Sequence, residues 1–211
     1  VQDRYSDDPE AVLVIAEVPV PTPGAGEVLV EVRAAGVDRG VWHLMAGKPT
    51  MVRPAVGLRR PRNPIRGLDL AGTIVAVGPD VDGFAVGDEV FGIGRSAFAE
   101  YAVAPTKKLA PKPANLTFEQ AASVPISGLT AIQAVRDQAQ VSASQRVLVI
   151  GAAGGVGSFA VQIATAFGAA VTAVCRGAKA DFVRSLGATE IIDHESQAID
   201  ALGGGYDAVL D

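Results

Sequence analysis

The sequence predicts an α/β protein in two parts, a mainly β first part and a second part built on a parallel sheet. Short segments with alternating apolar residues, separated by glycine and proline, follow one another in residues 1–112. In residues 113–211, apolar strand-like runs alternate with helical patterns, which is typical of βαβ units. We therefore place a domain boundary between residues 112 and 113.

Composition limits the class of protein. With 49% hydrophobic residues in a chain of 211, there is enough apolar material for a packed core. No apolar run reaches the roughly 18–20 residues of a membrane span, and the first ten residues lack the regions of a signal peptide, so we expect a cytoplasmic protein. The single Cys175 excludes a disulfide framework and a Cys-rich zinc site. The net charge of −5 argues against a general nucleic-acid partner.

One segment departs from this acidic balance. Residues 52–67, VRPAVGLRRPRNPIRG, contain five arginines and no acidic residue. Because prolines interrupt the segment and no aromatic residue is interleaved, we interpret it as a solvated loop. The alternative is that one of its arginines binds a cofactor phosphate or a partner subunit.

The first part shows the clearest strand signature in residues 27–37, where Val28, Val30 and Val32 recur with a period of two. Further strands, each bounded by glycine, proline or aspartate, are predicted at residues 71–78, 88–93 and 97–105.

The second part alternates helices with strands. Thr117 and Gln120 form a capping-box pair that opens a helix, and residues 127–139 follow as a second one. The remaining predicted elements are a strand at 146–150, a helix after it, a strand at 170–174, a helix at 178–187, a strand at 190–193, a short polar helix and a strand at 206–211. The helix after residue 150 has an apolar stripe made of Val156, Phe159, Ala160, Ile163, Ala164 and Phe167. Because a complete dinucleotide-binding fold has six strands and only four are seen, we expect a fragment of a longer enzyme.

A glycine-rich turn joins the first of these strands to its helix. A turn that binds a pyrophosphate needs small residues, because the chain turns tightly and its backbone approaches the phosphates. The helix start would add its free amides and positive dipole end. Ala152 replaces the first glycine of the strict pattern, and the alternative is a purely structural turn. We predict dinucleotide binding by Gly151, Gly154, Gly155, Val156 and Gly157.

The residues at the end of the next strand indicate which dinucleotide binds. An acidic residue there would favour NAD, whereas a basic one accommodates the 2′-phosphate of NADP. Here Cys175 is followed by Arg176 and, one helical turn later, Lys179, with no carboxylate among them. Their alternative role is that of ordinary exposed residues at a helix start. We predict NADPH as the cofactor.

Four motifs, GVDRGVWHLMAG, VPISGLTA, VLVIGAAGGVGSFAVQIA and RSLGATEIID, occur in the order of a known family. The chain resembles the zinc-independent, quinone oxidoreductase-like branch of the medium-chain dehydrogenase/reductase superfamily. The resemblance implies a GroES-like β domain at 1–112 and a Rossmann domain at 113–211, with a C-terminal part missing. It also implies an oxidoreductase, with a homodimer as one form that the family adopts.

Departures from the zinc-dependent alcohol dehydrogenases of that superfamily determine the expected chemistry. Asp38 occupies the position of a zinc-ligating cysteine, and Leu68 and Asp69 occupy those of a His-Glu pair. A ligand set of Asp38, His43 and Asp69 is an alternative, but its spacing matches no known zinc pattern. Without a Lewis acid the substrate must already be electrophilic. We therefore expect hydride transfer from NADPH to a quinone or an α,β-unsaturated carbonyl, with no metal.

The resemblance also implies roles for single residues. Asp38 stands where relatives often have an asparagine near the nicotinamide and the substrate. Trp42 and His43 would line the substrate cleft, with His43 a candidate proton donor, although the tryptophan could equally be a core residue. Thr130 would lie near the cofactor phosphates or nicotinamide, with a helix-start role as its alternative, and His194 beside the adenine ribose.

Two other functions remain open at this point. The first is a zinc-dependent alcohol dehydrogenase, which the missing ligands oppose. The second is a cofactor-binding protein without turnover.

Overall fold

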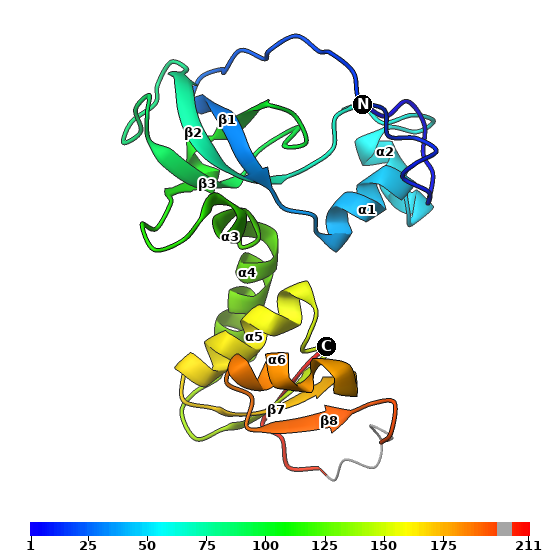
Figure 1. The fold of residues 1–211 in the computed structure, drawn as a ribbon, viewed down its shortest axis with the longest axis vertical. Coiled ribbons are helices and arrows are strands. Elements are labelled where there is room, and N and C mark those ends of the chain that lie inside the picture. Colours follow the sequence, from blue (N-terminus) through cyan, green and yellow to red (C-terminus); the bar gives the residue numbers. More distant parts are fainter. Residues whose placement is uncertain (198–203) are drawn as a thin grey trace. The chain divides into compact units, whose positions relative to one another are not determined.

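A computed structural model describes residues 1–197 and 204–211 of the chain (Figure 1). Contacts between Cα atoms divide it into two compact units, Val1–Ile126 and Ser127–Asp211, called unit 1 and unit 2 here. None of the helices in the described ranges is long and apolar enough to cross a membrane.

Unit 1 is built on an antiparallel sheet of order β4-β1-β2-β3-β5. Its strands are β1 (Glu27–Ala35), β2 (Asp69–Val77), β3 (Glu89–Ile93), β4 (Tyr101–Pro105) and β5 (Leu109–Pro111). Val28 and Val30, two of the alternating residues of β1, are completely buried with Leu70 and Ile74 of β2. The mainly β first part is therefore confirmed, and its core face is the one that the alternation selects.

Three short helices accompany this sheet: α1 (Arg39–Ala46), α2 (Arg53–Val56) and α3 (Phe118–Ala122). The sequence did not single out α1, whose N-cap is Asp38. The arginine segment is not wholly a solvated loop, because α2 lies within it and Arg66 is only 8% exposed. Arg66 donates hydrogen bonds to the carbonyls of Leu44 and Asn63, so backbone oxygens partly offset its burial.

The division between the units falls 14 residues after the expected boundary at residue 112. Helix α3 packs on β1, β2 and β3, and the amide of Ile126 donates to the carboxylate of Asp69 in β2. The connecting segment is therefore attached to the antiparallel sheet, which a change in hydrophobic period along the sequence does not reveal.

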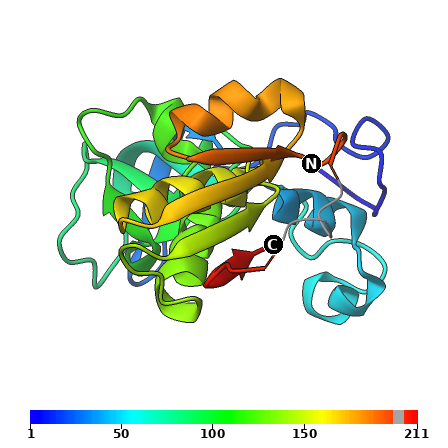
Figure 2. The ribbon, with the colours of Figure 1, turned by 90° about the horizontal axis from the view of Figure 1, so that it is seen from below.

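Unit 2 contains a parallel sheet of order β8-β7-β6-β9, whose first three strands lie side by side in Figure 2. Its strands are β6 (Arg146–Ile150), β7 (Ala170–Cys175), β8 (Glu190–Asp193) and β9 (Ala208–Leu210). Its helices are α4 (Pro125–Ile132), which crosses the division, α5 (Gly155–Ala166) and α6 (Ala180–Ser185), with a π-helical turn at Gln133–Gln138 and a 3-10 turn at Gly177–Lys179. The predicted βαβ pattern is confirmed; the short polar helix expected before residue 206 lies mostly in 198–203, outside the described residues.

Helix α5 buries a wider face than the predicted stripe. Ala160 and Ala164 are buried as expected, whereas Val156 is 39% exposed and Val161, which is not in the stripe, is completely buried. The helix contacts β6, β7 and the turn at Gln133–Gln138, so more than one side of it is covered. These contacts hold the start of α5 at the end of β6.

Candidate functional site

The turn between β6 and α5 is tight and depends on small residues. Gly151 has φ +68°, a left-handed conformation that favours glycine, and the amide of Gly154 donates to its carbonyl at 2.8 Å. Ala152 is completely buried, and its amide donates to the carbonyl of Val174 in β7 at 3.0 Å. The alanine at the first glycine position therefore fills a place in the core, and the turn closes without a glycine there.

Gly157 is required by the close contact between helix and turn. A Cβ at this position would lie 2.3 Å from the Gly151 carbonyl oxygen and 2.9 Å from the Cα of Ala152, both backbone atoms. Gly154, the N-cap of α5, provides no side-chain hydrogen bond to the helix start. The first amides of a helix have no acceptor within it, so Gly155, Val156 and Gly157 form a cradle suited to an anion.

Ser127 of α4 is a candidate site residue that the sequence analysis missed. A Cβ on Gly155 would lie 3.0 Å from its Oγ, so the serine hydroxyl lies against the first turn of α5. Thr130, which was predicted, is exposed on the same helix. The two residues are three positions apart, which places their hydroxyls on one helix face, and this spacing is the signal that could have identified Ser127.

Residues predicted for the adenosine end of the cofactor meet at the carboxyl ends of β7 and β8. Cys175 pairs in register with Asp193, and the amide of His194 donates to the Cys175 carbonyl at 3.3 Å. Arg176, Lys179 and His194 are exposed there, whereas Cys175 is only 3% exposed and burial raises the pKa of its thiol. Ligands bind at this edge of parallel sheets, so the arrangement fits the prediction.

Two carboxylates, which the sequence analysis did not name, lie beside the predicted cations. The carboxylate of Glu195 is 3.5 Å from Nε of Arg176. The carboxylate of Asp193 lies against the turn, because a Cβ on Gly177 would be 2.6 Å from its Oδ2. They escaped notice because Asp193 ends β8 and Glu195 follows it, whereas only the end of β7 was searched for acidic residues.

Asp38 in unit 1 has a structural role. As N-cap of α1 it accepts hydrogen bonds through Oδ1 from the amides of Gly40 and Val41. Its Oδ2 is buried and has no hydrogen-bond partner in the described part of the chain. One oxygen is thus fixed by the helix and the other is unsatisfied.

Asp69 is the most buried carboxylate of unit 1, at 2% exposure. Both of its oxygens lie 3.3 Å from the amide nitrogen of Ile126. Burial raises the pKa of Asp69 to about 6, the Ile126 hydrogen bond opposes this, and the nearby charge of Asp38 adds to it. This carboxyl group therefore titrates closer to neutral pH than an ordinary aspartate.

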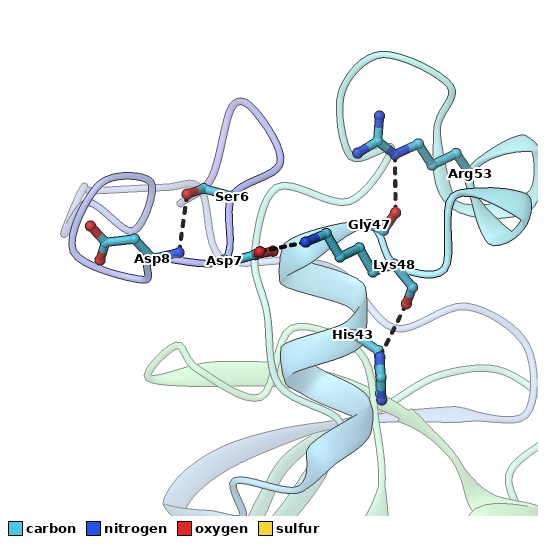
Figure 3. A network of polar contacts seen from close by, with 7 residues as sticks. All are labelled: Ser6, Asp7, Asp8, His43, Gly47, Lys48 and Arg53. Atoms are coloured by element: carbon cyan, nitrogen blue, oxygen red, sulfur yellow. Dashed lines mark hydrogen bonds and ion pairs between the residues drawn. The ribbon is translucent and has the colours of Figure 1, made fainter.

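His43 lies near the end of α1 in a network that ties this helix to the N-terminal segment (Figure 3). Its Nδ1 is 3.1 Å from the carbonyl oxygen of Lys48, whose ammonium group pairs with Asp7. Its ring contacts Trp42 edge to face, with centroids 5.1 Å apart. In the described part of the chain, no hydrogen bond or ion pair joins His43 to Asp38, so these two predicted residues do not form one polar cluster.

The donor set of unit 1 does not fit a zinc ion. Within residues 1–197 and 204–211, no three His, Cys, Asp or Glu side chains are grouped so that they could hold a metal. Oδ1 of Asp38 is used to cap α1, Asp69 accepts from the Ile126 amide, and His43 faces a carbonyl oxygen. A closed zinc site needs four convergent ligands and an open one needs three, and neither is found here.

Comparison with known proteins agrees with the two-part fold. Residues 24–114 match the family model of the alcohol dehydrogenase GroES-like domain, and residues 155–211 match that of zinc-binding dehydrogenases. A chloroplastic quinone oxidoreductase, QR1 of Triphysaria versicolor, is 37% identical over 92% of this chain and 61% of its own length. The chain thus spans about three fifths of that relative.

Solved structures give the same result. The quinone oxidoreductase of Coxiella burnetii is similar over the whole chain and 66% of its own, with a TM-score of 0.87 and 31% identity. A mycobacterial protein solved in complex with NADPH is also 31% identical, with a TM-score of 0.80, over 95% of this chain and 58% of its own. The mycobacterial complex shows that a relative with this fold binds the predicted cofactor.

Proposed function

The chain belongs to the medium-chain dehydrogenase/reductase superfamily, in its quinone oxidoreductase-like branch, and from this membership we propose that it is part of an NADPH-dependent reductase. The proposed substrates are quinones or α,β-unsaturated carbonyl compounds. The observation that carries the NADPH assignment is the pair Arg176 and Lys179, which lies at the end of β7, next to the glycine turn that follows β6.

In this proposal the cofactor supplies the hydride. The residues of unit 2 bind and orient it. The amides at the start of α5 hold the pyrophosphate, with the hydroxyls of Ser127 and Thr130 beside them. Arg176 offers a planar set of donors to the 2′-phosphate and Lys179 a mobile positive charge, while His194 lies beside the adenine ribose.

Zinc has no part in the proposed reaction, because the donor set of unit 1 does not fit it. The substrate must then be a conjugated carbonyl compound, which is already electrophilic. A proton neutralises the negative charge that develops on its oxygen when the hydride is added. Asp38 is the proposed polar contact, and its buried Oδ2 is the oxygen that the cap of α1 leaves unused. His43 is the proposed proton donor; because its Nδ1 faces the Lys48 carbonyl, its Nε2 donates a proton only when the ring is charged. Metal analysis of the purified protein tests the absence of zinc, and one equivalent of bound zinc would contradict it.

The main test compares binding of NADPH and NADH by calorimetry or thermal shift. The wild type is expected to bind NADPH more tightly, and the double variant Arg176→Ala/Lys179→Ala is expected to lose this preference while it binds NADH as before. Arg136→Ala is the control, since it removes an exposed arginine that pairs with its neighbour Asp137. Equal binding of both nucleotides by the wild type would overturn the assignment of the two cations.

Turnover has its own test. Oxidation of NADPH is followed at 340 nm with a panel of quinones and enones, using the full-length enzyme. Reduction of at least one class is expected. Tight NADPH binding without turnover of any member would favour the non-catalytic alternative.

The proposal includes a homodimer in the cytoplasm. Sedimentation velocity tests the oligomeric state, and cell fractionation tests the location.

A further inference from the structure

The predicted 2′-phosphate site already contains an anion from the protein itself. Glu195 lies two residues beyond β8, and its carboxylate is 3.5 Å from Nε of Arg176. Both side chains are largely exposed, at 71% for Arg176 and 60% for Glu195, so the pair is in contact with solvent and can separate. The contact therefore competes with any other anion that approaches this guanidinium.

The backbone holds Glu195 in this place. The amide of Glu195 donates to Oδ1 of Asp193 at 3.0 Å, which fixes the turn that follows β8. Asp193 is in register with Cys175, the last residue of β7, and its carboxylate lies against Gly177. The turn after β8 is thus placed beside the turn after β7 by sheet pairing as well as by one surface ion pair.

The two carboxylates are not equivalent. Asp193 uses Oδ1 to accept the Glu195 amide, so its position is set by the turn. Lys179 has no ion pair in residues 1–197 and 204–211, whereas Arg176 is paired with Glu195. Of the two predicted phosphate ligands, Arg176 must exchange a partner when the cofactor binds.

We propose that Glu195 determines cofactor specificity by competing with the 2′-phosphate for Arg176. This rests on the proposed NADPH site. The carboxylate lowers the affinity for nucleotides that carry a 2′-phosphate, and it accepts a hydrogen bond from the ribose 2′-hydroxyl of those that do not. The wild-type chain therefore discriminates less between the two cofactors than its arginine and lysine alone would.

The experiment measures binding of adenosine 2′,5′-bisphosphate and of 5′-AMP to the intact protein by calorimetry, because these probes differ only in the 2′-phosphate. Glu195→Gln keeps the size of the side chain and removes its charge. The ratio of the two affinities is expected to rise by about 2- to 5-fold, the range for an exposed ion pair. The rise is expected to shrink at high salt, since the competition is between exposed charges.

Two further variants separate competition from a general change of charge. Glu190→Gln removes the same charge from the other end of β8, where the carboxylate accepts from Thr172, and is expected to leave the ratio unchanged. In an Arg176→Ala background, Glu195→Gln is expected to raise the ratio by less than it does in the wild type, because there is then no competition for Arg176 to relieve. An unchanged or lower ratio in Glu195→Gln alone, or an equal rise in Glu190→Gln, would overturn the inference. If instead the wild type does not prefer the bisphosphate but Glu195→Gln raises the ratio, the NADPH assignment fails and the competition stands.

Discussion

The two units hold their candidate site residues in opposite ways. In unit 2 the backbone makes the site: a left-handed Gly151, a Gly157 that no other residue can replace and the ends of β7 and β8 form it, and the exposed Arg176 and Lys179 are added at its edge. In unit 1 the candidate side chains are parts of the local structure.

Asp38 caps a helix, Asp69 is buried against an amide, and His43 binds a backbone carbonyl. Changes to these residues therefore act on stability and function together. In unit 2 the two kinds of effect can be separated, because the residues that shape the turn differ from those that choose the ligand.

The largest effect is expected from Gly157→Ala. Its methyl group would overlap the Gly151 carbonyl and the backbone of Ala152, which cannot move without opening the turn. Overpacking typically costs about 1 to 3 kcal/mol; we expect the upper end of this range here, because the overlap is with backbone atoms, and nucleotide binding should be lost. Gly204→Ala is the control, because a Cβ there meets nothing within 4 Å among the residues that the structure describes. Urea denaturation measures both, and a Gly157→Ala variant as stable as the control would show that the turn is not closely packed.

The second largest effect is expected in unit 1, where the free energy of unfolding should depend on pH through Asp69. The pKa of Asp69 is raised to about 6, so the folded state binds this proton more tightly than the unfolded chain. The stabilisation from this bound proton is complete below about pH 4 and is lost as the pH rises through 6. The free energy of unfolding falls by roughly 2 to 3 kcal/mol over this range. Asp69→Asn keeps an acceptor for the Ile126 amide and removes the charge.

Asp69→Asn should therefore match the wild type near pH 4 and exceed its stability near pH 7.5. Chemical denaturation at the two pH values measures the difference between the proteins, so the titration of other groups cancels. A wild-type advantage at the higher pH would mean that the buried carboxylate is stabilised by its surroundings.

The same contrast explains what the sequence could predict. β6 and β8 have the bounds that their patterns predicted, and α5 starts at Gly155, because apolar runs and glycines determine these features locally. The helix α1 was missed, because its signals are a single capping aspartate at its start and Gly47 at its end. Glu195 and Ser127 were missed for a different reason: each reaches the site by pairing or packing between segments that are distant along the chain.

The third prediction separates structure from function at Asp38. Asp38→Ala removes the acceptor for two amides at the start of α1 and should cost about 1 kcal/mol. Asp38→Asn keeps an oxygen for these amides and should be nearly as stable as the wild type. If Oδ2 also contacts the substrate, Asp38→Asn raises KM at unchanged stability. Thermal denaturation and steady-state kinetics measure the two effects, and wild-type kinetics in this variant would leave Asp38 with only its capping role.

The smallest effect on stability is expected from Arg176→Ala, although this variant should change nucleotide binding strongly. Arg176→Ala removes a side chain that is 71% exposed and makes one long ion pair, so the free energy of unfolding without nucleotide should change by no more than about 0.5 kcal/mol. The additional stabilisation that NADPH gives over NADH at equal concentration should fall, because the stabilisation by a ligand increases with the logarithm of its affinity for the folded state. Denaturation with and without each nucleotide measures both quantities. A clear loss of stability in the nucleotide-free variant would mean that Arg176, like Asp38, is part of the local structure, and the proposed contrast between the two units would then fail at the residue expected to choose the cofactor.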